Sequence, residues 1–139
     1  MRPLDRAWLL ANLPHQGEMN LLEAISAWDA STIRAEARSH RSPTNPLRRE
    51  GYLPATAGIE YGAQAAAAHG ALLGEGGAGL LASVRAVRMH VARLDDLDAA
   101  LEILAEQLGG GAGGVLYRFE LTAAGRPLVE GRVTVAFAR

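Results

Sequence analysis

The chain contains no cysteine, which excludes disulfides, thiolate zinc sites and a cysteine nucleophile. It also lacks an excess of charge of either sign, with a net charge of −1 over 139 residues. The sequence therefore gives no electrostatic reason to expect binding to nucleic acid or to an anionic membrane surface. The four histidines are scattered and form no His-x-x-x-His pair, so we expect no metal site and no cofactor.

Long apolar runs are absent as well, since no stretch of about 20 apolar residues is free of charge. The N-terminus, Met1 to Arg6, carries charges where a signal peptide would have its apolar segment. We therefore expect a cytoplasmic protein. The length and the 49% hydrophobic content fit a single domain, residues 1–139, with a core of its own.

The order of predicted elements is helix, strand, strand, long loop, central helix and four strands. Alternation of apolar with charged residues supports several of the strands, for example at Ile33, Ala35 and Ala37. An antiparallel sheet wrapped around one apolar helix, an α+β fold, suits this order. The predicted ranges are a helix over 5–13, a strand buried on both faces over 19–28, a strand over 33–38, a loop over 40–53, the central helix over 54–74, strands over 80–91, 99–108, 115–121 and 129–137, and a flexible hairpin loop over 109–114. For residues 99–108 a helix is the alternative on propensity alone.

The central helix carries one carboxylate, Glu60, in an almost wholly apolar setting. Burying a carboxylate as an ion costs several kcal/mol unless something uses or satisfies it. Glu60 is therefore the first candidate for a functional residue, and the alternative is a structural carboxylate bonded to loop N–H groups. Small residues would let a sheet approach this helix closely, namely Gly58, Gly62, Ala63 and Ala66.

Two motifs together resemble the hotdog-fold β-hydroxyacyl-acyl-carrier-protein dehydratases over nearly the whole chain. The first is Leu13-Pro14-His15 followed by Leu21-Leu22, which is similar to the Leu-Pro-His and Leu-Leu strand that open that family. The second is Leu53-Pro54 followed by Gly58-Ile59-Glu60-Tyr61-Gly62-Ala63-Gln64, which is similar to its Met-Pro-Gly and Glu-Ala-Met-Ala-Gln helix.

The resemblance implies a dimer whose two sheets join edge to edge, with active sites at the subunit interface. It places the family's catalytic Glu on Glu60 and its helix Gln on Gln64. The family's catalytic His lies in a Gly-His-Phe-Pro-Gly segment, and the matching stretch here, residues 44–48, has no His. The chain is closer to a divergent branch of predicted dehydratases, some of them from aryl-polyene-type lipid clusters.

Removing water from a 3-hydroxyacyl thioester requires a base, an acid and a group that holds the enolate oxygen. Glu60 could be the acid or the base, and the helix start at Pro54 and Ala55 could hold the thioester carbonyl with its N–H groups and dipole. For the missing partner we expect His40, at the start of the loop; an exposed loop residue is the alternative there.

Three further residues are expected to line the substrate site. Asn45 lies in the stretch that replaces the family's His segment. Gln64, one turn beyond Glu60, could bond Glu60 or the substrate, or could only satisfy a buried backbone group. His15 matches a family position that mainly braces a turn, and a catalytic role is the less favoured alternative for it.

Other residues are expected to have structural or surface roles. His69 lies on the opposite side of the helix from Glu60 and is predicted to be structural, His90 is predicted to be on the surface, and Tyr61 is expected to pack at the dimer interface. The arginines of the loop and of the strand after the central helix are either solvated surface charge or a docking patch for an acidic carrier protein or a pantetheine phosphate; they are Arg41, Arg48, Arg49, Arg85, Arg88 and Arg93.

The sequence therefore predicts a dehydratase-like protein of fatty-acid or polyketide-type metabolism that acts on thioesters of acyl carrier protein or coenzyme A. We expect a homodimer, or a heterodimer with a second hotdog protein, or a higher oligomer. Two alternatives remain open: a thioesterase on the same fold, in which Glu60 activates water, and a non-catalytic subunit that binds acyl chains or completes a heterodimer.

Overall fold

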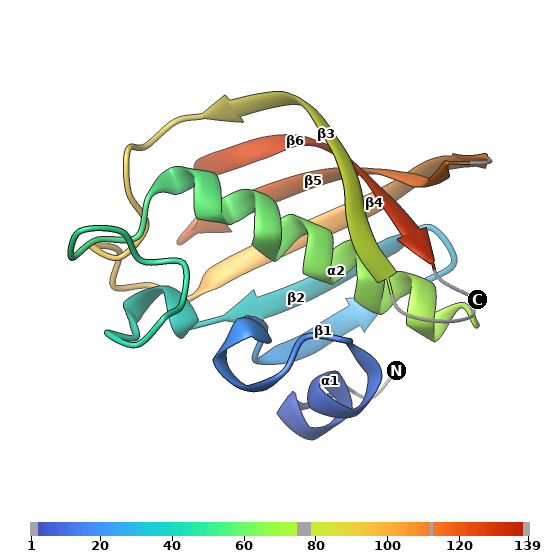
Figure 1. Cartoon of the computed structure of the whole chain (residues 1–139), viewed down its shortest axis with the longest axis horizontal. Coiled ribbons are helices and arrows are strands. Elements are labelled where there is room, and N and C mark those ends of the chain that lie inside the picture. Colours follow the sequence, from blue (N-terminus) through green and yellow to red (C-terminus); the bar gives the residue numbers. More distant parts are fainter. Residues whose placement is uncertain (1–2, 75–78, 112, 138–139) are drawn as a thin grey trace.

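A six-stranded antiparallel sheet curves around the helix α2 (Figure 1). The structure is a computed structural model that describes residues 3–74, 79–111 and 113–137. The strand order is β1-β2-β4-β5-β6-β3, which confirms the predicted α+β fold. The bounds are α1 (Arg6–Asn12), β1 (Ala24–Trp28), β2 (Thr32–Ala37), α2 (Gly58–Leu72), β3 (Gly79–Met89), β4 (Leu101–Gly111), β5 (Gly114–Ala123) and β6 (Arg126–Phe137), with short 3₁₀ turns at Gly17–Met19, Ser39–Arg41 and Ala55–Ala57.

The helix α2 is enclosed on all sides. Every residue from Tyr61 to Gly70 is buried, as expected for a helix that is apolar all round. The sheet covers one side of it, and α1 with the segment 17–22 lies against another. Among the described residues, no helix is long and apolar enough to cross a membrane.

Glycines bring α2 unusually close to the sheet. A Cβ atom on Gly62 would lie 2.5 Å from the Phe119 ring, and one on Gly58 would lie 2.9 Å from the Val129 side chain. Real Cβ atoms do not approach other atoms so closely, so a larger residue would push the helix away from β5 and β6. This confirms the expectation that small residues at these positions let the sheet approach.

The first strand is shorter and less buried than predicted. Residues 17–19 form a 3₁₀ turn, β1 begins only at Ala24, and Ser26 and Ala27 are exposed. The prediction of a strand buried on both faces was wrong, because β1 lies at the edge of the sheet. The backbone of Leu4 covers part of that edge through two hydrogen bonds with Ile25, of 2.9 and 2.8 Å.

The glycine-rich stretch is more regular than predicted. Gly109, Gly110 and Gly111 continue β4, and they pair with Leu116, Val115 and Gly114 of β5. The predicted flexible loop over 109–114 was therefore wrong at these positions, because ladder hydrogen bonds join backbone groups and require no side chain. Residue 112 lies outside the described residues. So do residues 75–77, where the stretch Gly74-Glu75-Gly76-Gly77 predicts a turn or a flexible hinge after the central helix.

The other edge of the sheet, β3, pairs only with β6 among the described strands. Large apolar side chains on β3 are exposed by 36 to 53%, namely Leu80, Leu81, Val84 and Met89. A long edge strand with exposed apolar side chains is a ready site for pairing with another chain.

Replacing Gly62 with Ala is expected to lower the free energy of unfolding by about 1–3 kcal/mol, because overpacking against Phe119 outweighs the helix propensity gained. Chemical denaturation measures the difference. Gly109→Ala is the matched control: a Cβ atom there meets nothing within 4 Å, so we expect a change within about 0.5 kcal/mol. Equal stability of the two variants would contradict the close approach of α2 to β5.

Candidate functional site

The start of α2 is attached to the segment 92–95. The N–H of Ala55 donates to the Ala92 carbonyl at 3.0 Å, and the N–H of Leu94 donates to the Leu53 carbonyl at 2.9 Å. The N–H of Ala57 bonds the carbonyl of Pro54 at 3.0 Å. The helix start therefore has fewer free N–H groups than its sequence suggested, and the N–H of Ala55 is already engaged.

Asp95 fixes the residue that precedes Pro54. Its carboxylate accepts a hydrogen bond from the N–H of Leu53 at 3.0 Å and two from the Arg93 guanidinium at 3.0 and 2.6 Å. Arg48 lies 3.8 Å from the same carboxylate. The hydrogen bonds from Arg93 and then that from Leu53 hold the pKa of Asp95 well below its usual range.

Glu60 and His15 are both only partly buried. Glu60 lies in the first turn of α2 and is half-buried, and among the described residues its carboxylate has no hydrogen bond or ion pair. His15 is also half-buried, and its Nδ1 is covered but has no partner within the described part of the chain. Burial lowers the pKa of His15, and the negative charge of Glu60 opposes that shift.

Gln64, one turn beyond Glu60, is buried and joins α2 to the segment that follows α1. Its Oε1 accepts from the N–H of Leu21 at 2.8 Å, and its Nε2 donates to the Met19 carbonyl at 2.7 Å. Asn20 lies between these two residues, and its Nδ2 donates to the carbonyls of Leu9 at 3.0 Å and His15 at 3.3 Å. These bonds favour the bracing role for Gln64 among the roles that the sequence left open.

Asn45 belongs to a buried network around Tyr61. Its Nδ2 donates to the Ser39 carbonyl at 2.9 Å and to the Tyr61 hydroxyl at 3.1 Å, and its Oδ1 accepts from the N–H of Leu47 at 2.9 Å. Tyr61 is fully buried within the chain, and burial raises the pKa of its hydroxyl. The expectation that Tyr61 packs at a dimer interface was therefore wrong.

His40 contacts a different segment of the chain, around Leu97. Its ring is fully buried, and its Nε2 bonds the Leu97 carbonyl at 3.0 Å. Burial lowers the pKa of His40, and the charged groups that also affect it are Arg41 and Asp95. Within the described residues, nothing connects His40 with Glu60, so the structure does not bring these two predicted catalytic residues together.

The other two histidines are placed as the sequence predicted. His69 is buried, its Nε2 donates to the Asp29 carbonyl at 2.8 Å, and its Nδ1 lies 2.7 Å from the Tyr117 hydroxyl. His90 is exposed and lies 3.3 Å from Glu130. No group of three or more ligating side chains that could hold a metal ion is present within residues 3–74, 79–111 and 113–137.

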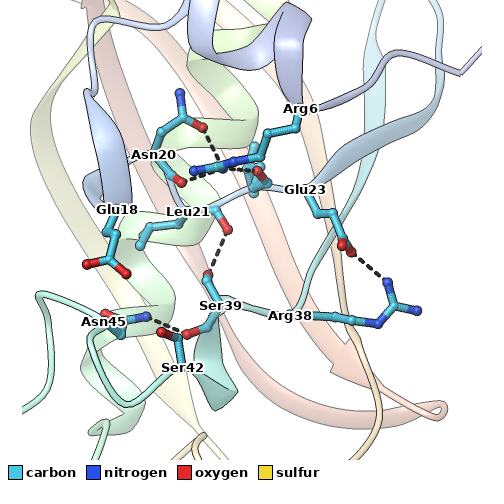
Figure 2. Close-up of a pocket in the computed structure, with 10 residues that line it drawn as sticks. Arg6, Glu18, Asn20, Leu21, Glu23, Arg38, Ser39, Ser42 and Asn45 are labelled. Carbon is cyan, nitrogen blue, oxygen red and sulfur yellow. Dashed lines mark hydrogen bonds and ion pairs between the residues drawn. The ribbon is translucent and has the colours of Figure 1, made fainter.

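A cavity of about 220 Å³ lies between the N-terminal segment, with Arg6 of α1 and residues 18–23, and the residues 38–45 that follow β2 (Figure 2). Its wall includes Leu21 and Ser39, which are joined by a 2.7 Å hydrogen bond from the Ser39 hydroxyl to the Leu21 carbonyl. Glu60 and His15 do not line this cavity. The remaining lining residues are Arg6, Glu18, Asn20, Leu22, Glu23, Arg38, Ser42 and Asn45.

Sequence reasoning missed Arg6, which lies at this cavity. Its guanidinium donates to the backbone carbonyls of Asn20, Leu22 and Gly17. These bonds hold the segment between α1 and β1 in its curved path. An arginine in a short surface helix gives no signal of such a role in the sequence, because its acceptors are backbone groups.

Comparison with known proteins gives a family match over nearly the whole chain. The model of the ApeP-like family, described as ApeP dehydratase, matches residues 9–138. No curated protein sequence matches.

Solved structures with the same fold include dehydratase and thioesterase proteins. A chain of the dehydratase heterocomplex ApeI:P from Xenorhabdus doucetiae is 24% identical with a TM-score of 0.79, over 92% of this chain and 89% of that one. AziG from S. sahachiroi is 20% identical with a TM-score of 0.63, over 87% and 93%. A thioesterase variant from Pseudomonas aeruginosa is 15% identical with a TM-score of 0.67, over 95% and 92%. These similarities support the hotdog fold.

Asp95→Asn is expected to lower the free energy of unfolding by about 1–3 kcal/mol at pH 7, because it weakens the bonds to Leu53 and Arg93. The pKa of Asp95 is lower in the folded protein than in the unfolded chain. The Asp95 carboxylate therefore makes its full contribution to the free energy of unfolding above about pH 4. This contribution is lost as the pH falls through the pKa of Asp95 in the folded protein. The difference in the free energy of unfolding between the wild type and Asp95→Asn should therefore become smaller at acidic pH. Urea unfolding at several pH values measures it.

The control for this prediction is Asp96→Asn, which changes the exposed neighbouring carboxylate and should leave stability within about 0.5 kcal/mol. A deficit in Asp95→Asn that stays constant between pH 7 and pH 3 would contradict the assignment.

Proposed function

The chain belongs to the ApeP-like dehydratase family, and from that membership we propose that it removes water from a 3-hydroxyacyl thioester of acyl carrier protein or coenzyme A in lipid synthesis. The observation that carries the proposal is the half-buried carboxylate of Glu60. It lies in the first turn of α2 and is left without a partner by the described residues, so it is available to a ligand.

In the proposed reaction, the carboxylate of Glu60 acts first as the base and then as the acid, and it transfers a single proton from the α-carbon to the leaving hydroxyl. Glu60 takes the proton from the α-carbon, and the electron pair of that C–H bond moves into the enolate of the thioester. The bond between the β-carbon and oxygen then breaks, a double bond forms between the α- and β-carbons, and the leaving hydroxyl takes the proton back from Glu60. The products are water and an enoyl thioester, and Glu60 returns to its starting state.

The start of α2 would stabilise the enolate oxygen in this reaction. The N-terminal end of a helix carries partial positive charge, which favours a developing negative charge nearby. Because the N–H of Ala55 already bonds Ala92, we propose that Pro54 and Ala55 shape the substrate site and that the helix dipole, rather than the Ala55 N–H, acts on the thioester carbonyl.

The free edge of β3 supports the proposal that two hotdog subunits join there. The exposed apolar side chains of β3 would be buried by pairing with the same edge of a neighbour. The opposite edge, β1, is partly covered by Leu4. Either a second copy of this chain or another hotdog chain could be the neighbour, as in the ApeI:P heterocomplex.

Glu60→Gln is expected to abolish the loss of water from 3-hydroxyacyl carrier protein, with a fall in rate of at least about 100-fold, because the amide cannot accept the α-proton. Mass spectrometry of the acyl carrier protein measures the loss of one water directly. The matched control is Glu102→Gln, which changes an exposed carboxylate on β4 and should retain full turnover.

The same assay separates the alternatives. Release of the free carrier protein, abolished in Glu60→Gln, would instead indicate a thioesterase. An unchanged substrate with wild-type protein, tested alone and with a second hotdog subunit, would contradict the proposed reaction and indicate a subunit that only binds acyl chains or completes an assembly.

Val84→Lys is expected to separate the two subunits, because it places a charge on the edge of β3 that would be buried between them. Analytical ultracentrifugation of the purified chain, alone and mixed with a second hotdog protein, measures the mass of the particle. Leu108→Lys is the control, since Leu108 is equally apolar and is 43% exposed but lies on β4, away from that edge. A two-subunit particle that persists in Val84→Lys would contradict pairing through β3.

A further inference from the structure

The outer face of the sheet, which points away from α2, carries a row of arginines across three neighbouring strands. Arg132 of β6 lies directly opposite Arg85 of β3 on one side and Arg118 of β5 on the other. Arg132 is exposed while the next residue, Val133, is buried, as strand alternation requires for an outward-facing side chain. Directly opposite residues have Cβ atoms about 4.5–5.5 Å apart, and like charges in such positions are destabilising. The chain therefore holds these positive charges together at a cost in free energy.

A bulge in β3 brings a fourth arginine to the same face. Residues three apart in a regular strand point to opposite faces. In β3, however, Arg85 is opposite Arg132, and the register shifts before the next pair. Arg88 is opposite Glu130, so three steps along β3 match two steps along β6. Within the bulge, Ala86 has a φ of 56°, a left-handed conformation that costs free energy for a residue other than glycine. This strained bulge re-aims Arg88 onto the face of Arg85.

A hollow of about 200 Å³ opens among these side chains. Its lining residues are Ala86, Arg88, Arg118, Glu130, Gly131 and Arg132. Three of them are arginines, and the small residues at 86 and 131 leave room between the arginines. The carboxylate in this lining, Glu130, lies 4.0 Å from Arg88 and 3.3 Å from His90. The hollow is therefore a basin with mostly cationic walls.

The positive charges of this face are only partly neutralised within the chain. Arg118 bonds Glu106 at 3.3 Å and also bonds Glu120. In contrast, the guanidinium groups of Arg85 and Arg132 have no hydrogen bond or ion pair within the part of the chain that the structure describes. Exposed like charges that are held opposite each other without a counter-charge indicate that the counter-charge comes from a ligand.

We propose that Arg85 and Arg132 bind a phosphate group on the outer face of the sheet, with Arg88 and Arg118 at the rim of the site. Guanidinium groups bind phosphate oxygens through paired, charge-assisted hydrogen bonds. A phosphate dianion between the opposed arginines would replace their repulsion with attraction to a shared partner. Free inorganic phosphate and the phosphate ester of a larger molecule share this chemistry, and the experiment distinguishes them.

This site is separate from the proposed active site. The inner face of the sheet contacts α2, where a Cβ atom on Gly58 or Gly62 would meet the Val129 or Phe119 side chain. The arginine row lies on the other face, so the inference does not depend on the proposed dehydration.

Isothermal titration calorimetry with inorganic phosphate tests the site in the protein as it assembles on purification, at constant ionic strength. Wild-type protein should bind phosphate, and Arg85→Gln and Arg132→Gln should each raise the dissociation constant at least about tenfold. Arg34→Gln is the matched control. Arg34 is also exposed on the outer face, at β2, but does not line the hollow, so its substitution should change the dissociation constant by less than about twofold.

A stability measurement gives a second readout, whose expected sign depends on the ligand. In chloride buffer of low ionic strength, Arg85→Gln removes a like-charge pair and should unfold at a higher urea concentration than wild type. In phosphate at the same ionic strength, wild type is stabilised by binding, so the difference should disappear or reverse. An advantage of Arg85→Gln that is equal in chloride and in phosphate would overturn the proposal, because it would show repulsion without binding.

The calorimetry also identifies the source of the phosphate group. Adenosine 3′-monophosphate is the organic probe, and adenosine is its control. Tighter binding of the monophosphate than of inorganic phosphate, lost in Arg132→Gln and absent with adenosine, would support the site with a phosphate ester as its ligand. Weaker binding of the monophosphate would support the site with free phosphate as its ligand. Wild-type protein that binds neither probe, or an equal loss of binding in Arg34→Gln and Arg85→Gln, would overturn the proposal and leave the proposed function untouched.

Discussion

The close approach between α2 and the sheet is the constraint on which the rest of the structure depends. Glycine at positions 58 and 62 lets the helix lie against Val129 and Phe119 at distances that no side chain could tolerate. With the sheet on one side and the N-terminal segment on another, only the two ends of α2 reach the surface. The one carboxylate of the helix lies at its first turn, so the packing itself places Glu60 at the accessible end.

Hydrogen bonds from side chains to the backbone fix the segments that have no regular structure. Asp95 holds Leu53 before the helix, Gln64 holds Met19 and Leu21, and Arg6 holds the turn after α1. These bonds fix the positions of the loop segments around the candidate site, because neither strand pairing nor helix packing positions a loop. The described residues leave the carboxylate of Glu60, in the first turn of α2, without a hydrogen bond or ion pair.

Local patterns were sufficient to predict the order of elements and the central helix. The alternation of Ile33, Ala35 and Ala37 predicted their burial correctly, and the small residues predicted the contact face of α2. The path of residues 17–23 and the burial of Tyr61 could not be predicted, because they depend on bonds between residues far apart in the chain, such as Gln64 with Leu21. For the same reason the sequence could not show that the His40 ring is buried and bonded to the carbonyl of Leu97.

The two edges of the sheet differ, and this difference bears on the proposed assembly. The edge at β1 is partly closed by the chain's own Leu4, whereas β3 pairs with no strand other than β6 in the part of the chain that the structure describes. A chain with two open edges could add neighbours without end and grow into a fibre. In the assembly proposed above, the pairing of Leu4 with Ile25 would leave less of β1 than of β3 open to a further neighbour, so the N-terminal segment would disfavour such growth as well as covering the core.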